Sequence, residues 1–112
     1  MNDLDVTNAK NHLIKLIPPV LKNDLVQMIM YGSCARGDYN DDSDIDIALL
    51  TRCDRKTAKK YDDLLMDIVT EIAMQLDMLV EYICIPYTEF ETKKGWYGYY
   101  KNIDLEGVVI YG

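Results

Sequence analysis

Two aspartates one residue apart, Asp44 and Asp46, alternate with two isoleucines, Ile45 and Ile47. Because successive side chains of a β-strand point to opposite faces, this pattern predicts a strand that buries the isoleucines and presents both carboxylates on its other face. Two carboxylates about 4 Å apart repel each other by roughly 4 kcal/mol at an effective dielectric constant near 20. We therefore expect a cation between them, and Mg²⁺ prefers carboxylate oxygens, water and phosphates as ligands.

A glycine-serine turn precedes the two aspartates and predicts the other half of the same site. Gly32 and Ser33 directly follow an apolar run. Backbone amides in a tight turn that leads into a helix bind phosphate oxygens. A phosphate-binding turn next to a pair of carboxylates predicts chemistry on a nucleoside triphosphate.

The two motifs together resemble a known family. After the serine the chain reads Cys-Ala-Arg-Gly, and ten residues separate Ser33 from Asp44, which Ser43 precedes. This pattern resembles the minimal nucleotidyltransferases, in the superfamily that includes DNA polymerase beta. The resemblance covers residues 26–85 and, more loosely, residues 101–111.

This resemblance implies a two-metal nucleotidyl transfer with ATP as the substrate. Two Mg²⁺ ions would stabilise the attacking and leaving oxygens of an in-line displacement. Asp44 and Asp46 would be catalytic and would hold both ions, and no histidine base is required. The residues implied to bind the nucleotide are Gly32, Ser33, Arg36 and Ser43. For Arg36 a loop-bracing role is an equal alternative to a phosphate contact.

The superfamily uses a third carboxylate from a neighbouring strand, and two residues are candidates. Glu81 lies inside the expected strand over residues 78–85, whereas Asp77 lies just before it. An acidic residue in an otherwise apolar strand requires a reason to be there. Glu81 also falls where relatives carry their third acid, so we expect Glu81 to be the third catalytic metal ligand, with Asp77 as the alternative.

The apolar pattern predicts a helix, two strands, a helix and two further strands. The helices are expected over residues 9–17, with Thr7 or Asp5 as the N-cap, and over residues 61–76. The strands are expected over residues 25–31, 44–50, 78–85 and 108–111, with irregular structure from 86 to 107. This order predicts an α+β (α/β) class, and the resemblance implies the nucleotidyltransferase fold. We expect one domain, 1–112, with a small mixed sheet and helices mainly on one face.

Composition argues against several functions. The net charge is −7, with 12 basic and 19 acidic residues, which argues against a nucleic-acid surface. The one basic cluster, residues 52–60, fits either a solvated helix start or a contact patch for an acidic partner. No apolar run approaches the ~18 residues of a membrane span, and the start does not resemble a signal peptide. Three cysteines then indicate reduced thiols in a cytoplasmic protein, and Cys34 has no nearby histidine to activate it.

Minimal nucleotidyltransferases of this size resemble antitoxins whose toxin is a helical HEPN ribonuclease. The family attaches AMP to a toxin tyrosine, so the expected function is Mg-dependent transfer of AMP from ATP to a hydroxyl, a tyrosine of a HEPN-type partner. A partner or a second copy would complete the site. One alternative is an antitoxin that neutralises its partner by contact alone, through Trp96, Tyr97, Tyr99 and Tyr100. Another is a small-molecule, drug-modifying nucleotidyltransferase that acts as a dimer.

Overall fold

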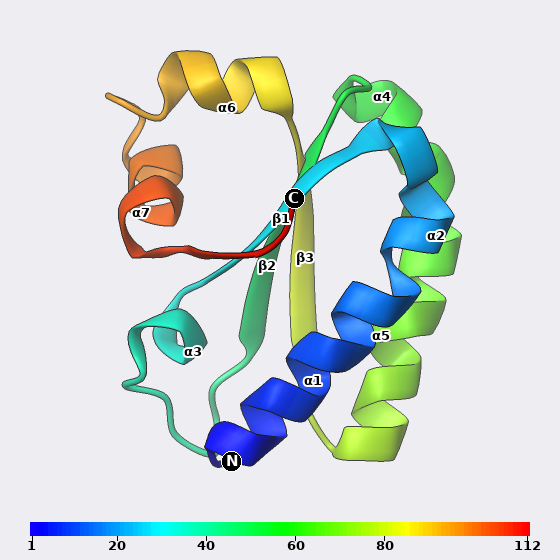
Figure 1. Cartoon of the computed structure of the whole chain (residues 1–112), viewed down its shortest axis with the longest axis vertical. Helices are drawn as coiled ribbons and strands as arrows, with labels where there is room; N and C mark the ends of the chain where they lie inside the picture. Colours follow the sequence, from blue (N-terminus) through cyan, green and yellow to red (C-terminus); the bar gives the residue numbers. More distant parts are fainter.

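One mixed β-sheet organises the molecule, which a computed structural model describes over all residues, 1–112 (Figure 1). The strand order is β3-β2-β1-β4, so β3 and β4 form the two edges of the sheet. Strand β1 pairs antiparallel with both β2 and β4, whereas β2 and β3 are parallel. The strands are β1 (Leu25–Tyr31), β2 (Ile45–Thr51), β3 (Val80–Pro86) and β4 (Val108–Tyr111).

Helices lie on both faces of this sheet (Figure 1). On one face lie α1 (Asp3–Leu16), α2 (Pro18–Leu21) and α5 (Asp62–Leu76), and on the other lie α6 (Tyr87–Lys93) and α7 (Gly98–Glu106). The one-turn helix α3 (Ser33–Arg36) follows β1, and α4 (Arg55–Ala58) follows β2. None of these helices is both long and apolar enough to cross a membrane.

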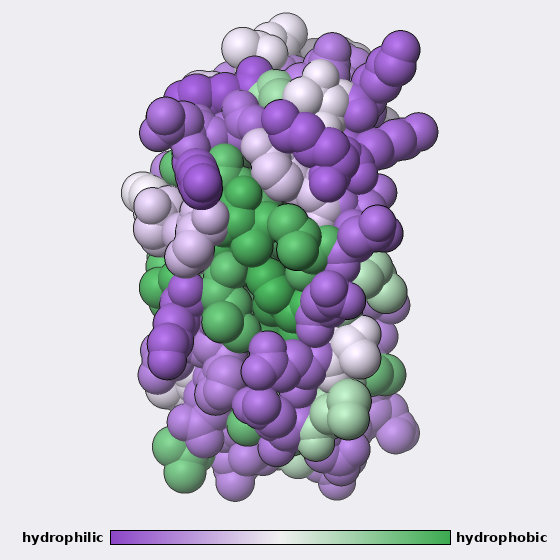
Figure 2. Space-filling model, turned by 90° about the vertical axis from the view of Figure 1, so that its right-hand side faces the viewer, coloured by the Kyte–Doolittle hydropathy of each residue, from purple (hydrophilic) through white to green (hydrophobic).

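The alternation along β2 divides the core into two parts. Ile45, Ile47 and Leu49 are fully buried in a cluster of 17 buried residues that includes side chains of α1, α2 and α5. Ala48 and Leu50 point to the other face, in a cluster of seven that includes α6 and α7. The two longest helices, α1 and α5, lie on the face of the larger core, while the shorter α6 and α7 cover the other face. Figure 2 shows the outer surface of that helical layer, where apolar side chains gather in a patch framed by hydrophilic ones.

The α/β class and the mixed sheet are confirmed, and most predicted boundaries agree with the structure to within two residues. Strands β1 and β4 have the predicted bounds, whereas β2 begins one residue later than predicted and β3 two residues later. The predicted N-cap at Thr7 or Asp5 is wrong. Helix α1 begins at Asp3, and Asn2 caps it by accepting a hydrogen bond from the Asp5 amide, while the Asp5 carboxylate accepts one from the Asn2 amide.

The prediction of irregular structure over residues 86–107 is also wrong, because this segment forms α6 and α7. Each helix is shorter than three turns, so neither displays a long apolar stripe in the sequence. Their core contacts are a few large side chains, Phe90 from α6 and Tyr100 with Ile103 from α7. These residues cover the second face of the sheet. This packing stabilises the two helices despite the glycines in the segment.

Candidate active site

Three neighbouring strands bring three polar side chains into one row across the sheet. Asp46 in β2 lies opposite Glu81 in β3 and opposite Tyr31 in β1. Residues that are paired across strands point to the same face, which here is the face of α6 and α7. The row is open at its β3 end, where Glu81 is exposed, and half-buried at Asp46 and Tyr31.

Asp44 lies one residue before β2, beside this row. Ile45 and Ile47 are fully buried, and Asp44 and Asp46 on either side of Ile45 remain partly accessible. The strand therefore directs the two carboxylates away from the larger core. A buried isoleucine on each side of Asp46 fixes its position, because a slip of one residue would place the aspartates in the core.

The carboxylates influence one another electrostatically. Burial raises the pKa of Asp46, and the negative charge of Asp44 raises it further. The charge of Asp44, followed by that of Asp46, raises the pKa of Glu81. The three carboxylates therefore lie close enough to repel one another, and a bound cation would reduce this repulsion.

The carboxylates of the row fit a Mg²⁺ site that water and the phosphates of the substrate would complete. No group of three or more His, Cys, Asp or Glu side chains is gathered tightly enough to hold an ion alone. Mg²⁺ usually binds through one or two carboxylates together with waters and substrate phosphates, so a closed protein cage is not required. Asp44, Asp46 and Glu81 supply oxygen ligands of that kind.

The turn after β1 contacts Asp46 directly. Gly32 has a φ of +76°, and a Cβ added there would lie 2.5 Å from Asp46 Oδ2. Only glycine allows this close approach at a positive φ. The amides of Ala35 and Arg36 both donate to the Gly32 carbonyl, which closes α3 directly after the glycine. The first amides of a helix have no partner within it, so the amide of Ser33 belongs to a set that can bind an oxyanion.

Arg36 and Ser43 make contacts within the protein. Arg36 Nε lies 3.2 Å from Asp38 Oδ2, and its Nη1 lies 3.0 Å from Glu106 Oε2. These ion pairs brace the loop after α3 against the end of α7, and the Arg36 charge also lowers the pKa of Asp46. The hydroxyl oxygen of Ser43 accepts a hydrogen bond from the Asn40 amide at 3.0 Å, which holds the loop before Asp44.

Asp77 lies outside β3, in contrast to Glu81. It ends α5 as the C-cap residue with a φ of 54°, in the left-handed region. It therefore shares no strand face with Glu81. Asp77 instead lines a hollow that also contains Met1 and Asp41.

Three residues at this site were not predicted from the sequence: Tyr31, Tyr99 and Glu106. The hydroxyl groups of Tyr31 and Tyr99 are 2.5 Å apart, and their rings meet edge to face with centroids 6.0 Å apart. Burial and the Tyr99 hydroxyl raise the pKa of Tyr31, and the charges of Asp46 and Glu81 raise it further. The position of Tyr31 immediately before Gly32 was a usable signal. Tyr99 lies 68 residues from Tyr31, and Glu106 lies 70 residues from Arg36, so no local pattern placed either residue at this site.

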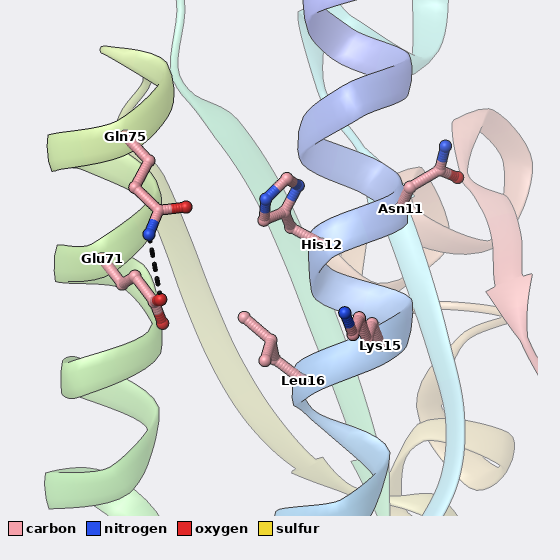
Figure 3. A pocket seen from close by; sticks show the side chains of 6 residues that line it. All are labelled: Asn11, His12, Lys15, Leu16, Glu71 and Gln75. Carbon is pink, nitrogen blue, oxygen red and sulfur yellow. Dashed lines mark hydrogen bonds between the residues drawn. The ribbon is translucent and has the colours of Figure 1, made fainter.

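A hollow between α1 and α5 lies on the opposite face of the sheet (Figure 3). It measures about 320 Å³, and its lining includes His12 and Leu16 from α1. On the α5 side, Gln75 Nε2 donates to Glu71 Oε1 at 3.1 Å. His12 Nδ1 lies 2.9 Å from the carbonyl oxygen of Asn8 in its own helix. The hollow contains none of the acidic residues of the row, so it belongs to the helical layer.

Comparisons with known proteins show the family to which the chain belongs. The sequence model of the nucleotidyltransferase domain family matches residues 13–111. A protein of Methanocaldococcus jannaschii, provisionally named a protein adenylyltransferase, is 31% identical over 103 residues, which covers 92% of this chain and 95% of that protein. A second protein of the same organism with the same provisional name is 33% identical over 69 residues, covering 62% of this chain and 68% of its own.

Solved structures share the fold. A toxin–antitoxin crystal structure with AMP-PNP superimposes with a TM-score of 0.59 at 20% identity, covering 92% of this chain and 73% of that chain. A mutant of the toxin–antitoxin pair MntA–HpeT, with two aspartates replaced by glutamates, gives a TM-score of 0.60 at 19% identity over the same shares. Sequence and fold agree, and the chain belongs to the nucleotidyltransferase domain family.

Proposed function

We propose that this nucleotidyltransferase transfers AMP from ATP to a hydroxyl group of a protein. The carboxylate row carries this proposal: Asp46 packs against Gly32 on one side and lies opposite Glu81 on the other. A phosphate-binding turn and a carboxylate pair in contact are the two parts that nucleotidyl transfer requires. The relatives named as protein adenylyltransferases support a protein acceptor.

Each residue has a distinct role in this proposal. Asp44 and Asp46 would hold two Mg²⁺ ions, and Glu81 would complete the ligands on the acceptor side. When bound, the ions supply positive charge that stabilises the attacking and leaving oxygens. The amides of the turn and the Ser33 hydroxyl would hold the β- and γ-phosphates. Arg36, which is partly exposed, would keep α3 in place through Asp38 and Glu106.

The proposed acceptor is a tyrosine of a helical, HEPN-type toxin. Support comes from the toxin–antitoxin complexes of the same fold, one of them with the ATP analogue AMP-PNP. In this proposal the chain acts as an antitoxin by modifying its partner. The ATP-binding and metal sites are then parts of the neutralising reaction.

Label transfer from α-labelled ATP with Mg²⁺ into a lysate of the source organism tests the proposal. We expect one labelled protein with the wild type and at least about a hundredfold less label with Asp44→Asn or Asp46→Asn, because charge stabilisation at the reacting phosphate is lost. Asp42→Asn is the matched control, since Asp42 lies exposed in the same loop. It should label as the wild type does.

The other outcomes have defined meanings. Undiminished labelling by Asp46→Asn would contradict the proposed mechanism. Label in a small molecule would assign the chain to small-molecule transfer. Absence of label from a folded sample that binds ATP and captures a protein would favour neutralisation by contact.

A further inference from the structure

A shallow groove runs along the open edge of β3 and reaches the carboxylate row. Its volume is about 480 Å³, and four of its five lining residues are apolar or aromatic: Met66 and Val69 from α5, with Val80 and Tyr82 from β3. The fifth is Glu81, which also lies opposite Asp46. The groove lies on the α5 face and the carboxylate row on the α6 and α7 face, so the two meet only at Glu81, at the edge of the sheet.

The side from which the acceptor approaches follows from the order of the row. The Gly32 turn contacts Asp46 from the β1 side, so the phosphates that leave as pyrophosphate lie on that side. In an in-line displacement the attacking oxygen approaches opposite to the leaving group. The opposite side is the β3 edge, where Glu81 is exposed.

The surface around the groove is apolar at its centre and acidic at its border. Met66 is 52% exposed, and Leu79, which precedes Val80 in the chain, is 62% exposed. Asp62 and Asp63 lie one helical turn before Met66, and the Tyr82 hydroxyl donates to Asp62 Oδ1 at 3.1 Å. Together with Glu81, these residues place negative charge beside the apolar lining of the groove.

The edge of β3 is also open to pairing around Glu81, whereas farther along Arg55 Nη1 lies 3.5 Å from the Cys84 carbonyl oxygen. The sheet ends at this strand, which pairs only with β2. An unpaired edge accepts an extended segment through main-chain hydrogen bonds, while alternate side chains of that segment enter neighbouring pockets. A segment bound in this way would run directly past Glu81.

We propose that this groove binds the acceptor as an extended basic polypeptide segment, with an apolar side chain between α5 and β3 and its hydroxyl residue beside Glu81. The inference rests on the proposed function and adds the chemistry of the acceptor: lysine or arginine near the modified residue and a β-branched or other apolar residue within reach of Met66. The acidic border then repels acidic segments, which gives specificity as well as affinity.

Peptide binding without ATP tests the groove independently of transfer. The probes are two fluorescent peptides with a central tyrosine between valines, one flanked by lysines and the other by glutamates. We expect the basic peptide to bind more tightly by about tenfold or more, and Met66→Arg to weaken it by about tenfold, which corresponds to about 1.4 kcal/mol. Asp63→Asn should weaken it less and should not perturb the groove's packing.

Met74→Arg is the matched control, because Met74 is 82% exposed on the same helix and does not line the groove. It should bind the basic peptide as the wild type does, and thermal unfolding establishes that each variant is folded. Equal binding of both peptides, or unchanged binding in both Met66→Arg and Asp63→Asn, would overturn the proposal. Self-association of the wild type that Met66→Arg abolishes would assign the groove to a second copy instead and would also overturn it.

The two proposals fail in different ways. Groove-dependent peptide binding without any AMP transfer would leave the groove in place and contradict the catalytic function. AMP transfer to protein that is insensitive to Met66→Arg and Asp63→Asn would retain the catalytic function and remove the groove.

Discussion

Asp46 is the residue on which the site depends most. It lies in contact with Gly32, between Tyr31 and Glu81 across the sheet, and next to a buried isoleucine on either side. Its raised pKa records partial burial beside another carboxylate. Such an arrangement costs stability by itself and is typical of a functional site.

Replacement of Gly32 tests this contact. Gly32→Ala places a Cβ 2.5 Å from Asp46 Oδ2 at a φ of +76°, so we expect the free energy of unfolding to fall by about 1–3 kcal/mol and AMP transfer to fall as well. Gly98→Ala is the control. Gly98 is the first residue of α7, and a Cβ added there would have no other atom within 4 Å. Chemical denaturation followed by circular dichroism measures both, and equal stability of the two variants would contradict the tight contact.

At the scale of elements, α7 closes the site on the side of β1. Tyr99 joins it to Tyr31, and Glu106 at its last turn joins it to Arg36 of α3. Two polar contacts thus attach one helix to both the strand and the turn that form the site. Helix α7 therefore positions the turn that follows β1, although it contributes no carboxylate to the row.

A double-mutant cycle on Tyr31→Phe and Tyr99→Phe tests this attachment. We expect each single variant to lose about 1 kcal/mol of unfolding free energy, because a half-buried hydroxyl loses its partner, and the double variant to lose little more than either one. Urea denaturation of the four proteins measures the coupling. Strictly additive losses would show that the two hydroxyls do not interact. Tyr87→Phe, an exposed tyrosine on α6, serves as the control.

Local patterns in the sequence predicted the strands but not the elements that join distant segments. The apolar run from Leu25 to Tyr31 was sufficient to predict β1, and the alternation around Ile45 was sufficient to predict β2. In a strand, the pattern of buried and exposed side chains follows from residues that are adjacent in the sequence. Helices α6 and α7 are stabilised by packing on the sheet, and their sequences show no helical period of apolar residues that would have predicted them. The proximity of Glu81 to Asp46 depended on the register of two parallel strands, which the sequence left open between Glu81 and Asp77.

At the scale of the whole molecule, negative charge is the dominant property. The net charge is −7, and acidic residues gather both at the carboxylate row and along α5. Net charge of one sign destabilises the compact state by self-repulsion and attracts positively charged partners. A cation at the row and a basic segment at the groove would reduce this repulsion at two separate places.

Thermal unfolding in Mg²⁺ separates specific binding of the ion from general screening of charge by salt. In the presence of AMP-PNP, we expect MgCl₂ to raise the unfolding temperature of the wild type above the value in NaCl of equal ionic strength, because specific binding adds about 2.7 kcal/mol at a hundredfold excess over Kd. The Asp44→Asn/Asp46→Asn double variant should lose this excess and keep the response to NaCl, which reflects general screening. The same excess in both proteins would place Mg²⁺ binding outside the carboxylate pair.

The sheet order has a consequence for how the molecule opens. Strand β2 lies between β3 and β1, and its residues from Ile47 to Thr51 are almost fully buried, so its amides should exchange with deuterium among the slowest in the protein. Asp46 is anchored in that strand, whereas partly exposed side chains attach α3 to α7 and α7 to β1. Local opening of α3 would therefore leave the strand that carries Asp46 intact, and we expect the amides of α3 to exchange faster than those of β2.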